Sequence, residues 1–181
     1  QYGVLVTSVA PLDVDDKDRI AKDPNLVAQF LKVVELFRPD LVHIHCIQLL
    51  TAGIIDVLLE LDIPYCITLH DAWWISDQQF VIDELGQPGL YNYPSPLETL
   101  ERRGAKAVAR MESLRDRLFG ARTVLAVSEA FADLYRSAGV HNVQTIENVS
   151  APLRPVHASA KNPGVSVWAL SAAWHVTREG T

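Results

Sequence analysis

Short apolar runs alternate with longer segments of helical periodicity along the first 150 residues of the chain. The short runs are rich in valine, isoleucine and leucine, as buried parallel strands are, and lie at residues 3–9, 41–46, 65–69, 123–127 and 142–147. Apolar positions three and four apart predict helices at residues 24–37, 49–61 and 128–138. Strands that alternate with helices predict an α/β fold with a Rossmann-like, doubly wound, mainly parallel sheet.

Several of the predicted helices carry residues that favour a helix end. Asp23 precedes Pro24, which is the order of an N-cap followed by proline at the first helical position. Gly139 suits the position just beyond the helix that ends at residue 138. The capping box of residues 95–98 predicts the start of a further long helix. The intervening segment, residues 71–94, exceeds the usual connection length, which is typical of functional or disordered loops.

The chain changes character near residue 150. Residues 1–150 form the predicted domain, and because the chain enters an apolar run at once we expect this domain to be truncated at its N-terminus. Residues 151–164 contain three prolines and no periodicity, which indicates a linker. One more strand follows at residues 165–170, so we interpret residues 165–181 as the start of a second domain or as a tail.

Composition and charge limit the classes of protein to which the chain can belong. The chain is 49% hydrophobic and 21% charged, and no apolar run is long enough to cross a bilayer. The net charge of −6 argues against a nucleic-acid-binding surface. Cys46 and Cys66 each lie in an apolar stretch, which predicts two buried free thiols in a reducing compartment. We therefore expect a cytoplasmic protein.

Polar side chains follow four successive predicted strands. Ligands of open α/β sheets bind beyond the carboxyl ends of the strands, so these residues are candidates for a common site. In chain order they are His45 and Gln48, then His70 and Asp71, then Ser128 and Glu129, and finally Asn148. Such a gathering at one end of the sheet exceeds what random placement would produce.

Most of these residues also have a structural interpretation. Ser128 can act as the N-cap of its helix, although a helix N-terminus is also an anion site. Asn148 suits a turn with a left-handed backbone. Of the two histidines on one face of their strand, His43 is the better candidate for a core histidine, which leaves His45 for the site.

The tryptophans and a metal site leave further alternatives open. Trp73 and Trp74 are either core residues or, next to His70 and Asp71, a flat apolar platform for a sugar ring. A zinc site is conceivable, but the spacing of its candidate ligands matches no standard pattern. Those ligands would be His43, His45, Cys46 and His70.

Other sequence features exclude some functions. The chain has no glycine-rich dinucleotide fingerprint, no phosphate loop and no Gly-x-Ser-x-Gly elbow, which weakens dehydrogenase, NTPase and hydrolase assignments. Arg102, Lys106 and Arg110 form a basic stripe at helical spacing. The stripe is either a solvated face or a surface that rests on anionic lipid or an acidic acceptor. The second alternative predicts peripheral contact with the inner face of a membrane.

Four segments together resemble a known enzyme family. They are FRPDLVHIHCIQ, IPYCITLHDAWWIS, TVLAVSEAFADLYRSAGV and VQTIENVS, over roughly residues 25–150. In order and spacing the set is similar to glycosyltransferases of the GT-B fold, specifically the retaining family 4 that uses nucleotide sugars. The resemblance implies the acceptor-binding N-terminal half of a two-domain enzyme that builds a polysaccharide or glycolipid.

The resemblance also implies roles for particular residues. His70 matches the histidine that lies near the transferred sugar, and with Asp71 it is expected to act in positioning and electrostatics rather than as a nucleophile. The remaining candidates are expected on the substrate side of the cleft: His45, Gln48, Trp74, Ser128, Glu129 and Asn148. No cofactor and no metal are expected, because helix dipoles and basic residues of the donor domain balance the diphosphate charge. The partners are a nucleotide sugar and a saccharide or lipid-linked acceptor.

The chain departs from the family pattern in several places. The family's first strand and glycine-rich loop would precede residue 1, and its donor-domain Glu-x7-Glu motif is missing. Val149 stands where the family commonly has glycine after the asparagine. We therefore expect this chain alone to be inactive. Two other functions stay open, a non-catalytic carbohydrate-binding module and an unrelated Rossmann-like enzyme with His70 and Asp71 as an acid/base pair.

Overall fold

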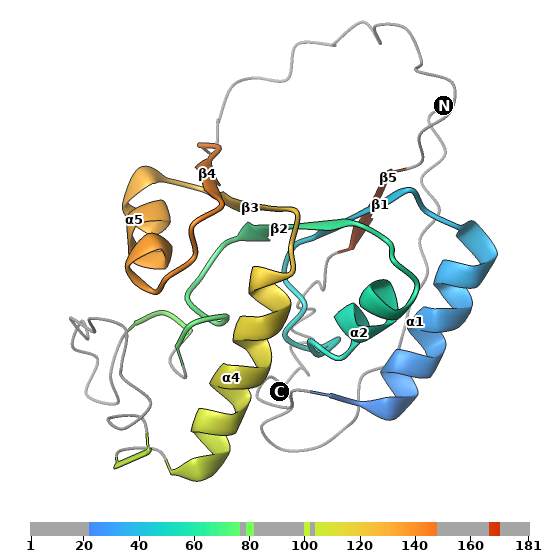
Figure 1. Ribbon diagram of the computed structural model, residues 1–181, viewed down its shortest axis with the longest axis horizontal. Helices are drawn as coiled ribbons and strands as arrows, with labels where there is room; N and C mark the ends of the chain where they lie inside the picture. Colours follow the sequence, from blue (N-terminus) through green and yellow to red (C-terminus); the bar gives the residue numbers. More distant parts are fainter. Residues whose placement is uncertain (1–21, 77–78, 82–99, 102–103, 148–166, 171–181) are drawn as a thin grey trace, which may run out of the picture.

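The computed structural model describes residues 22–76, 79–81, 100–101, 104–147 and 167–170 (Figure 1). These residues contain five parallel strands and four α-helices, joined by loops. The helices are α1 (Pro24–Phe37), α2 (Ile54–Glu60), α4 (Ala105–Phe119) and α5 (Glu129–Ser137). The strands are β1 (Leu41–Ile44), β2 (Tyr65–Leu69), β3 (Thr123–Ala126), β4 (Val143–Thr145) and β5 (Val167–Leu170).

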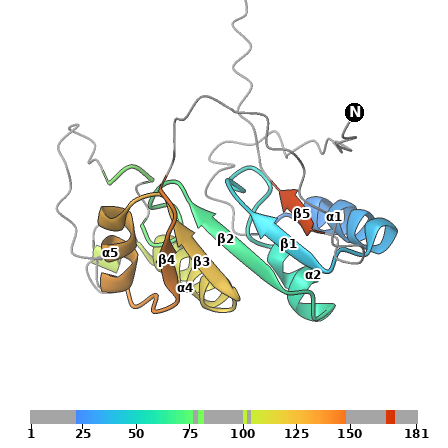
Figure 2. The ribbon, with the colours of Figure 1, turned by 90° about the horizontal axis from the view of Figure 1, so that it is seen from above.

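The strands form one sheet in the order β4-β3-β2-β1-β5, and every pairing is parallel. This arrangement confirms the predicted Rossmann-like α/β class. Figure 2 shows the strands side by side, with α5 beside β4 at one edge of the sheet and α1 near the other edge. Helix α5 contacts β3 and β4, and α1 packs against α2. Because all the strands run in one direction, their carboxyl ends share one edge of the sheet.

The helix ends follow the capping residues. The Asp23 carboxylate accepts hydrogen bonds from the backbone N–H groups of Asn25 and Leu26, and Pro24 opens α1 as predicted. Helix α5 begins after Ser128, whose hydroxyl accepts a hydrogen bond from the Phe131 N–H. Gly139 follows that helix with φ of +88°, a left-handed conformation that favours glycine.

The core lies between the sheet and its helices. Ile44, Ile67 and Val124 come from three neighbouring strands and are completely buried. Leu58 of α2 and Leu114 of α4 pack into the same hydrophobic cluster, also with no exposed surface. The intervening positions of β1, β2 and β3 are only half-buried, so one face of these strands is packed more tightly than the other.

The predicted helix at residues 49–61 is wrong at its start, because α2 begins at Ile54. Thr51 has φ of +61°, which no α-helix contains, so residues 45–53 form a loop instead. The Thr51 hydroxyl accepts a hydrogen bond from the Asp23 N–H at 3.3 Å, which ties this loop to the start of α1. The apolar pattern of the sequence continues through this loop because several of its side chains, including Ala52, are buried.

Several predictions fall outside the described residues: the strand at 3–9, the capping box at 95–98 and the linker at 151–164. The described helix α4 begins at Ala105, after Gly104 with φ of +83°. Strand β5 pairs with β1 at the edge of this same sheet. The separate second domain predicted for the C-terminal residues stays a prediction. In the described part of the chain, no helix is both long and apolar enough to span a membrane.

Candidate functional site

Two histidines meet at the carboxyl edge of the sheet. His45 follows β1 and His70 follows β2, and these neighbouring parallel strands end side by side. His45 Nδ1 lies 3.1 Å from His70 Nε2, within hydrogen-bond distance, and the ring centroids are 5.4 Å apart. One nitrogen of this pair donates the proton and the other accepts it, so the contact holds only while at least one ring is neutral.

His43, which lies on β1, adds a third ring to the histidine pair. Its ring lies 4.3 Å from that of His45, centroid to centroid, and its Nε2 is 2.8 Å from the Thr68 hydroxyl on β2. His43 is half-buried and hydrogen-bonded, as expected of a structural histidine, whereas the His70 side chain is exposed. The exposed member of the cluster is therefore the one that a ligand can reach.

The surroundings of His43 and His45 favour neutral imidazoles at these two positions. Burial lowers the pKa of His45 below its ordinary value of 6.5, and the nearby His43 and His70 lower it further because a second positive charge is repelled. Burial and His70 likewise lower the pKa of His43. Near pH 7 the neutral His45 ring can therefore offer both a hydrogen-bond donor and an acceptor.

Asp71, beside His70, is buried in a set of hydrogen bonds. Its carboxylate accepts bonds from Gln48 Nε2 at 2.8 Å and from Gln79 Nε2 at 2.6 Å, and also from the Trp73 N–H at 2.9 Å. The side chain is only 7% exposed. These bonds hold the loops after β1 and β2 together, so Asp71 is placed to orient its neighbours rather than to meet a ligand.

Two residues that the sequence analysis did not assign to this site complete the arrangement. The Tyr135 hydroxyl donates to the Asp71 backbone oxygen at 2.6 Å, so α5 supports the turn after β2. Arg110 Nη2 donates to the Trp73 carbonyl at 3.3 Å, and its guanidinium lies 4.9 Å from the centre of the Trp73 ring. Gln79 is a third such residue, and only its place in a long loop beside His70 and Asp71 could have pointed to it.

The burial of Arg110 shows that the predicted basic stripe is not a continuous exposed surface. With Arg102 and Lys106 it was one of three cations that could rest on a membrane or an acidic acceptor, but Arg110 is only 7% exposed. Arg102 lies outside the described side chains, and Lys106 is exposed. Lys106 and Arg110 both lie on α4, but Arg110 faces the domain interior, where its guanidinium contacts the Trp73 ring and donates to the Trp73 carbonyl.

The tryptophans lie in the core. Trp73 and Trp74 are 2% and 4% exposed, and their rings meet edge to face with centroids 5.0 Å apart. In this arrangement neither ring presents a flat exposed platform, which agrees with the packing alternative for both. Gln48 is similarly buried, and its Oε1 has no hydrogen-bond partner among the described residues.

The other predicted site residues lie along the same edge. Ser128 caps α5 and is half-buried, and the exposed Glu129 follows it. Hydrogen bonds from the Thr145 hydroxyl and from Arg136 lower the pKa of the Glu129 carboxyl. Asn148 lies outside the described residues.

A sequence profile of the glycosyl transferase 4-like domain matches residues 3–148, most of the chain. This chain belongs to the glycosyl transferase 4-like domain family. The profile supports a general role in glycosyl transfer. No curated protein and no solved structure matches the chain.

Within this glycosyl transferase 4-like domain, the described residues offer no group of three or more histidine, cysteine, aspartate or glutamate side chains that could hold a metal ion. Cys46 and Cys66 are free and half-buried, and burial raises the pKa of both thiols. The chemistry that the site does offer is hydrogen bonding through the His45 and His70 rings.

Proposed function

We propose that this domain supplies the acceptor side of a GT-B glycosyltransferase cleft. In this proposal a sugar moves from a nucleotide-sugar donor to a saccharide or lipid-linked acceptor with retention of configuration, and a second Rossmann-like domain holds most of the donor. The observation that carries the proposal is the contact between His45 and His70 at the carboxyl edge of the sheet, in a chain of a glycosyltransferase 4-like family.

In this proposal His70 acts near the transferred sugar. One of its ring nitrogens contacts His45, which orients the ring, and the exposed side chain offers the other nitrogen to a substrate oxygen. A hydrogen-bond donor fixed in this way stabilises charge that develops as the bond to the leaving group breaks. Asp71 serves as a positioning residue, because three hydrogen bonds from the protein already occupy its carboxylate.

The acceptor contacts and the setting belong to the same proposal. Beside His45, the residues proposed to contact the acceptor are Ser128, Glu129 and Asn148. The buried Gln48 and Trp74 are proposed to shape the acceptor region from within the domain. The proposal needs no metal, because helix N-termini and basic residues of the donor domain would balance the diphosphate charge. We propose a cytoplasmic enzyme.

Replacing His70 tests the proposal in the full encoded enzyme. The measurement is release of nucleoside diphosphate from a panel of donors that includes UDP-glucose, UDP-N-acetylglucosamine and GDP-mannose. His70→Ala should lower turnover about 100-fold, since a lost electrostatic donor costs roughly 10²–10³ in rate. Donor affinity, measured by calorimetry, should stay within about twofold of the wild type, because the second domain binds most of the donor.

The control is Lys32→Ala, an exposed position of α1 that should leave turnover unchanged. Unchanged turnover in His70→Ala would exclude the proposed role of His70. Saturable saccharide binding without transfer to any acceptor would instead support the carbohydrate-binding module. Hydrolysis of simple esters that depends on His70 would support the unrelated acid/base enzyme.

A further inference from the structure

The structure contains a surface hollow at the amino-terminal edge of the sheet. Its lining residues come from the end of α4 and from the connection between α5 and β4: Arg115, Phe119, Gly139, His141 and Asn142. The connections that contain them lead into β3 and β4, whereas His45 and His70 follow the carboxyl ends of β1 and β2. The hollow is therefore remote from the histidine pair, at the opposite end of the strands.

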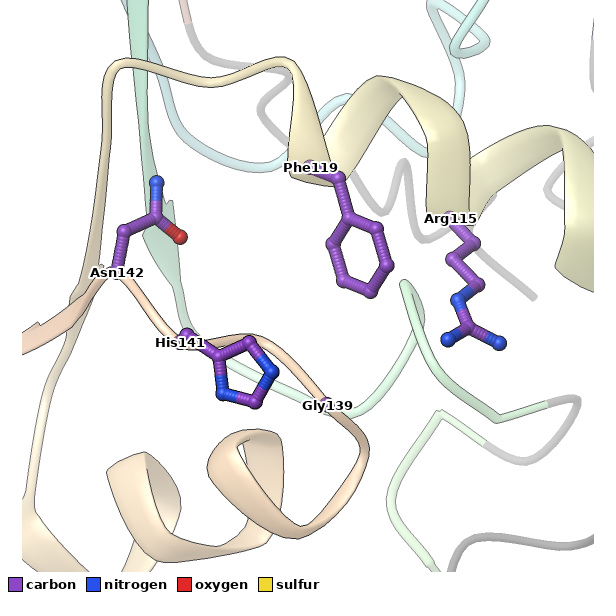
Figure 3. A pocket seen from close by; sticks show the side chains of 5 residues that line it. All are labelled: Arg115, Phe119, Gly139, His141 and Asn142. Atoms are coloured by element: carbon purple, nitrogen blue, oxygen red, sulfur yellow. The ribbon is translucent and has the colours of Figure 1, made fainter.

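Three of these side chains face a common space. Figure 3 shows the Arg115 guanidinium and the Phe119 ring from α4 on one side and the His141 ring on the other. The hollow has a volume of about 480 Å³, within the usual range of small-molecule sites. The Asn142 side chain donates to the Ala121 carbonyl at 2.9 Å, which joins the two connections that form the walls.

Gly139 keeps the hollow open. A Cβ atom at this position would lie 3.7 Å from Arg115 Nη2 and 3.9 Å from Phe119 Cζ, so a side chain would extend towards the guanidinium and the ring. The positive φ of +88° also makes any other residue costly here. The backbone of the α5 end therefore leaves space directly beside the cation and the aromatic face.

Arg115 carries a charge that the described residues do not neutralise. Among the described residues, the guanidinium carbon of Arg115 lies 4.9 Å from the centroid of the Phe119 ring, and no described carboxylate forms an ion pair with this guanidinium. By contrast, Arg117 is paired with Asp56, and Arg136 with Glu129 and Asp133. A guanidinium held on an aromatic ring keeps its N–H edge for a carboxylate or phosphate.

We propose that this hollow is a second binding site, for a small molecule that carries a phosphate group on a planar ring. Arg115 would donate hydrogen bonds to the phosphate, and the exposed faces of Phe119 and His141 would receive the ring. The site does not depend on the proposed transfer reaction, because it lies at the other end of the sheet from His70.

The test is a titration of the 181-residue chain with phenyl phosphate, followed by the backbone amide signals of Gly139 and Asn142 in two-dimensional NMR spectra. Saturable shifts confined to the residues of the hollow are expected. Inorganic phosphate should bind at least fivefold more weakly because it lacks the ring, and phenol should not saturate because it lacks the charge.

Variants distinguish a specific binding site from nonspecific attraction of anions. Arg115→Gln should weaken phenyl phosphate binding about tenfold, and Phe119→Leu should weaken it while leaving inorganic phosphate binding unchanged. Arg122→Gln is the matched control, since Arg122 is an exposed arginine nearby that does not line the hollow. Equal losses in Arg115→Gln and Arg122→Gln, equal affinity for inorganic and phenyl phosphate, or shifts that never saturate would each overturn the proposal.

Discussion

Asp71 shows how the site depends on one buried carboxylate. Hydrogen bonds join it to Gln48 after β1, to Gln79 beyond β2 and to the Trp73 N–H, while Tyr135 holds its backbone oxygen. A carboxylate buried in this way is stable only because its oxygens are satisfied. Its role follows from these four partners, which fix the backbone next to His70.

Asp71→Ala should therefore destabilise the fold. The change leaves the buried Gln48 amide, the half-buried Gln79 amide and the Trp73 N–H without their acceptor, so the free energy of unfolding should fall by about 3 kcal/mol. Urea denaturation followed by tryptophan fluorescence measures the loss. Asp116→Asn, at an exposed position of α4, should change stability by less than about 0.5 kcal/mol. A loss below about 1 kcal/mol in Asp71→Ala would show that these hydrogen bonds do not support the fold.

The histidine cluster should make stability depend on pH. Burial, His43 and His70 hold the pKa of His45 below 6.5 in the folded state, whereas the unfolded chain takes up a proton near 6.5. The unfolded state then binds more protons between these two values, so stability is complete above about pH 6.5 and falls as the pH drops towards the folded pKa. Denaturation at pH 7.5, 6.5 and 5.5 measures this trend.

His45→Gln should flatten that pH dependence, because glutamine does not titrate and can still bond to His70. Lys32→Gln should keep the wild-type slope, since Lys32 lies on the exposed face of α1. An unchanged slope in His45→Gln would assign the pH dependence to other groups.

At the scale of elements, a hydrogen bond holds the C-terminal end of α4 to the sheet. The Tyr65 hydroxyl on β2 donates to the Arg117 carbonyl at 2.6 Å, and burial raises the pKa of Tyr65 to about 12. Arg117 in turn binds Asp56 of α2 through both carboxylate oxygens, at 2.8 and 3.0 Å. One turn of α4 thus joins β2 and α2. The helix ends at Phe119, and the following residue, Gly120, lies against the Tyr65 hydroxyl.

Gly120→Ala tests this close approach. A Cβ atom at Gly120 would lie 2.6 Å from the Tyr65 hydroxyl oxygen, although φ of −72° is acceptable for alanine. The substitution should cost about 2 kcal/mol through this overlap. In a Tyr65→Phe background the overlap with oxygen is gone, and the added cost should fall by more than half. Strictly additive costs in a double-mutant cycle would contradict the proposed contact.

At the scale of the whole molecule, the parallel sheet separates two chemically different ends. The carboxyl edge brings together the histidine pair and the N-terminus of α5, and the amino edge contains the hollow of Arg115, Phe119, Gly139, His141 and Asn142. A strand of four or five residues spans about 15 Å, so a ligand at one end does not reach the other. The two proposed sites can therefore be tested and can fail independently.

Much of this architecture could be predicted from local patterns. The apolar runs and helical periodicity predict the parallel α/β class, and Asp23, Ser128 and Gly139 mark helix ends that the structure confirms. Parallel strands share one direction, so the gathering of His45 and His70 at one edge also followed from the order of the segments. The start of α2 did not, because the positive φ at Thr51 leaves no trace in hydrophobic periodicity.

The sequence by itself determined the class of fold, the helix caps and the edge of the sheet at which polar residues collect, because each depends on near neighbours along the chain. Only the tertiary structure decided which partners those residues have. Tyr135 reaches Asp71 across 64 positions, and Arg110 turns inward to Trp73 across 37. Such contacts depend on strand order, register and helix packing. These are set when residues far apart in the sequence pack together in the core, and local propensity does not determine them.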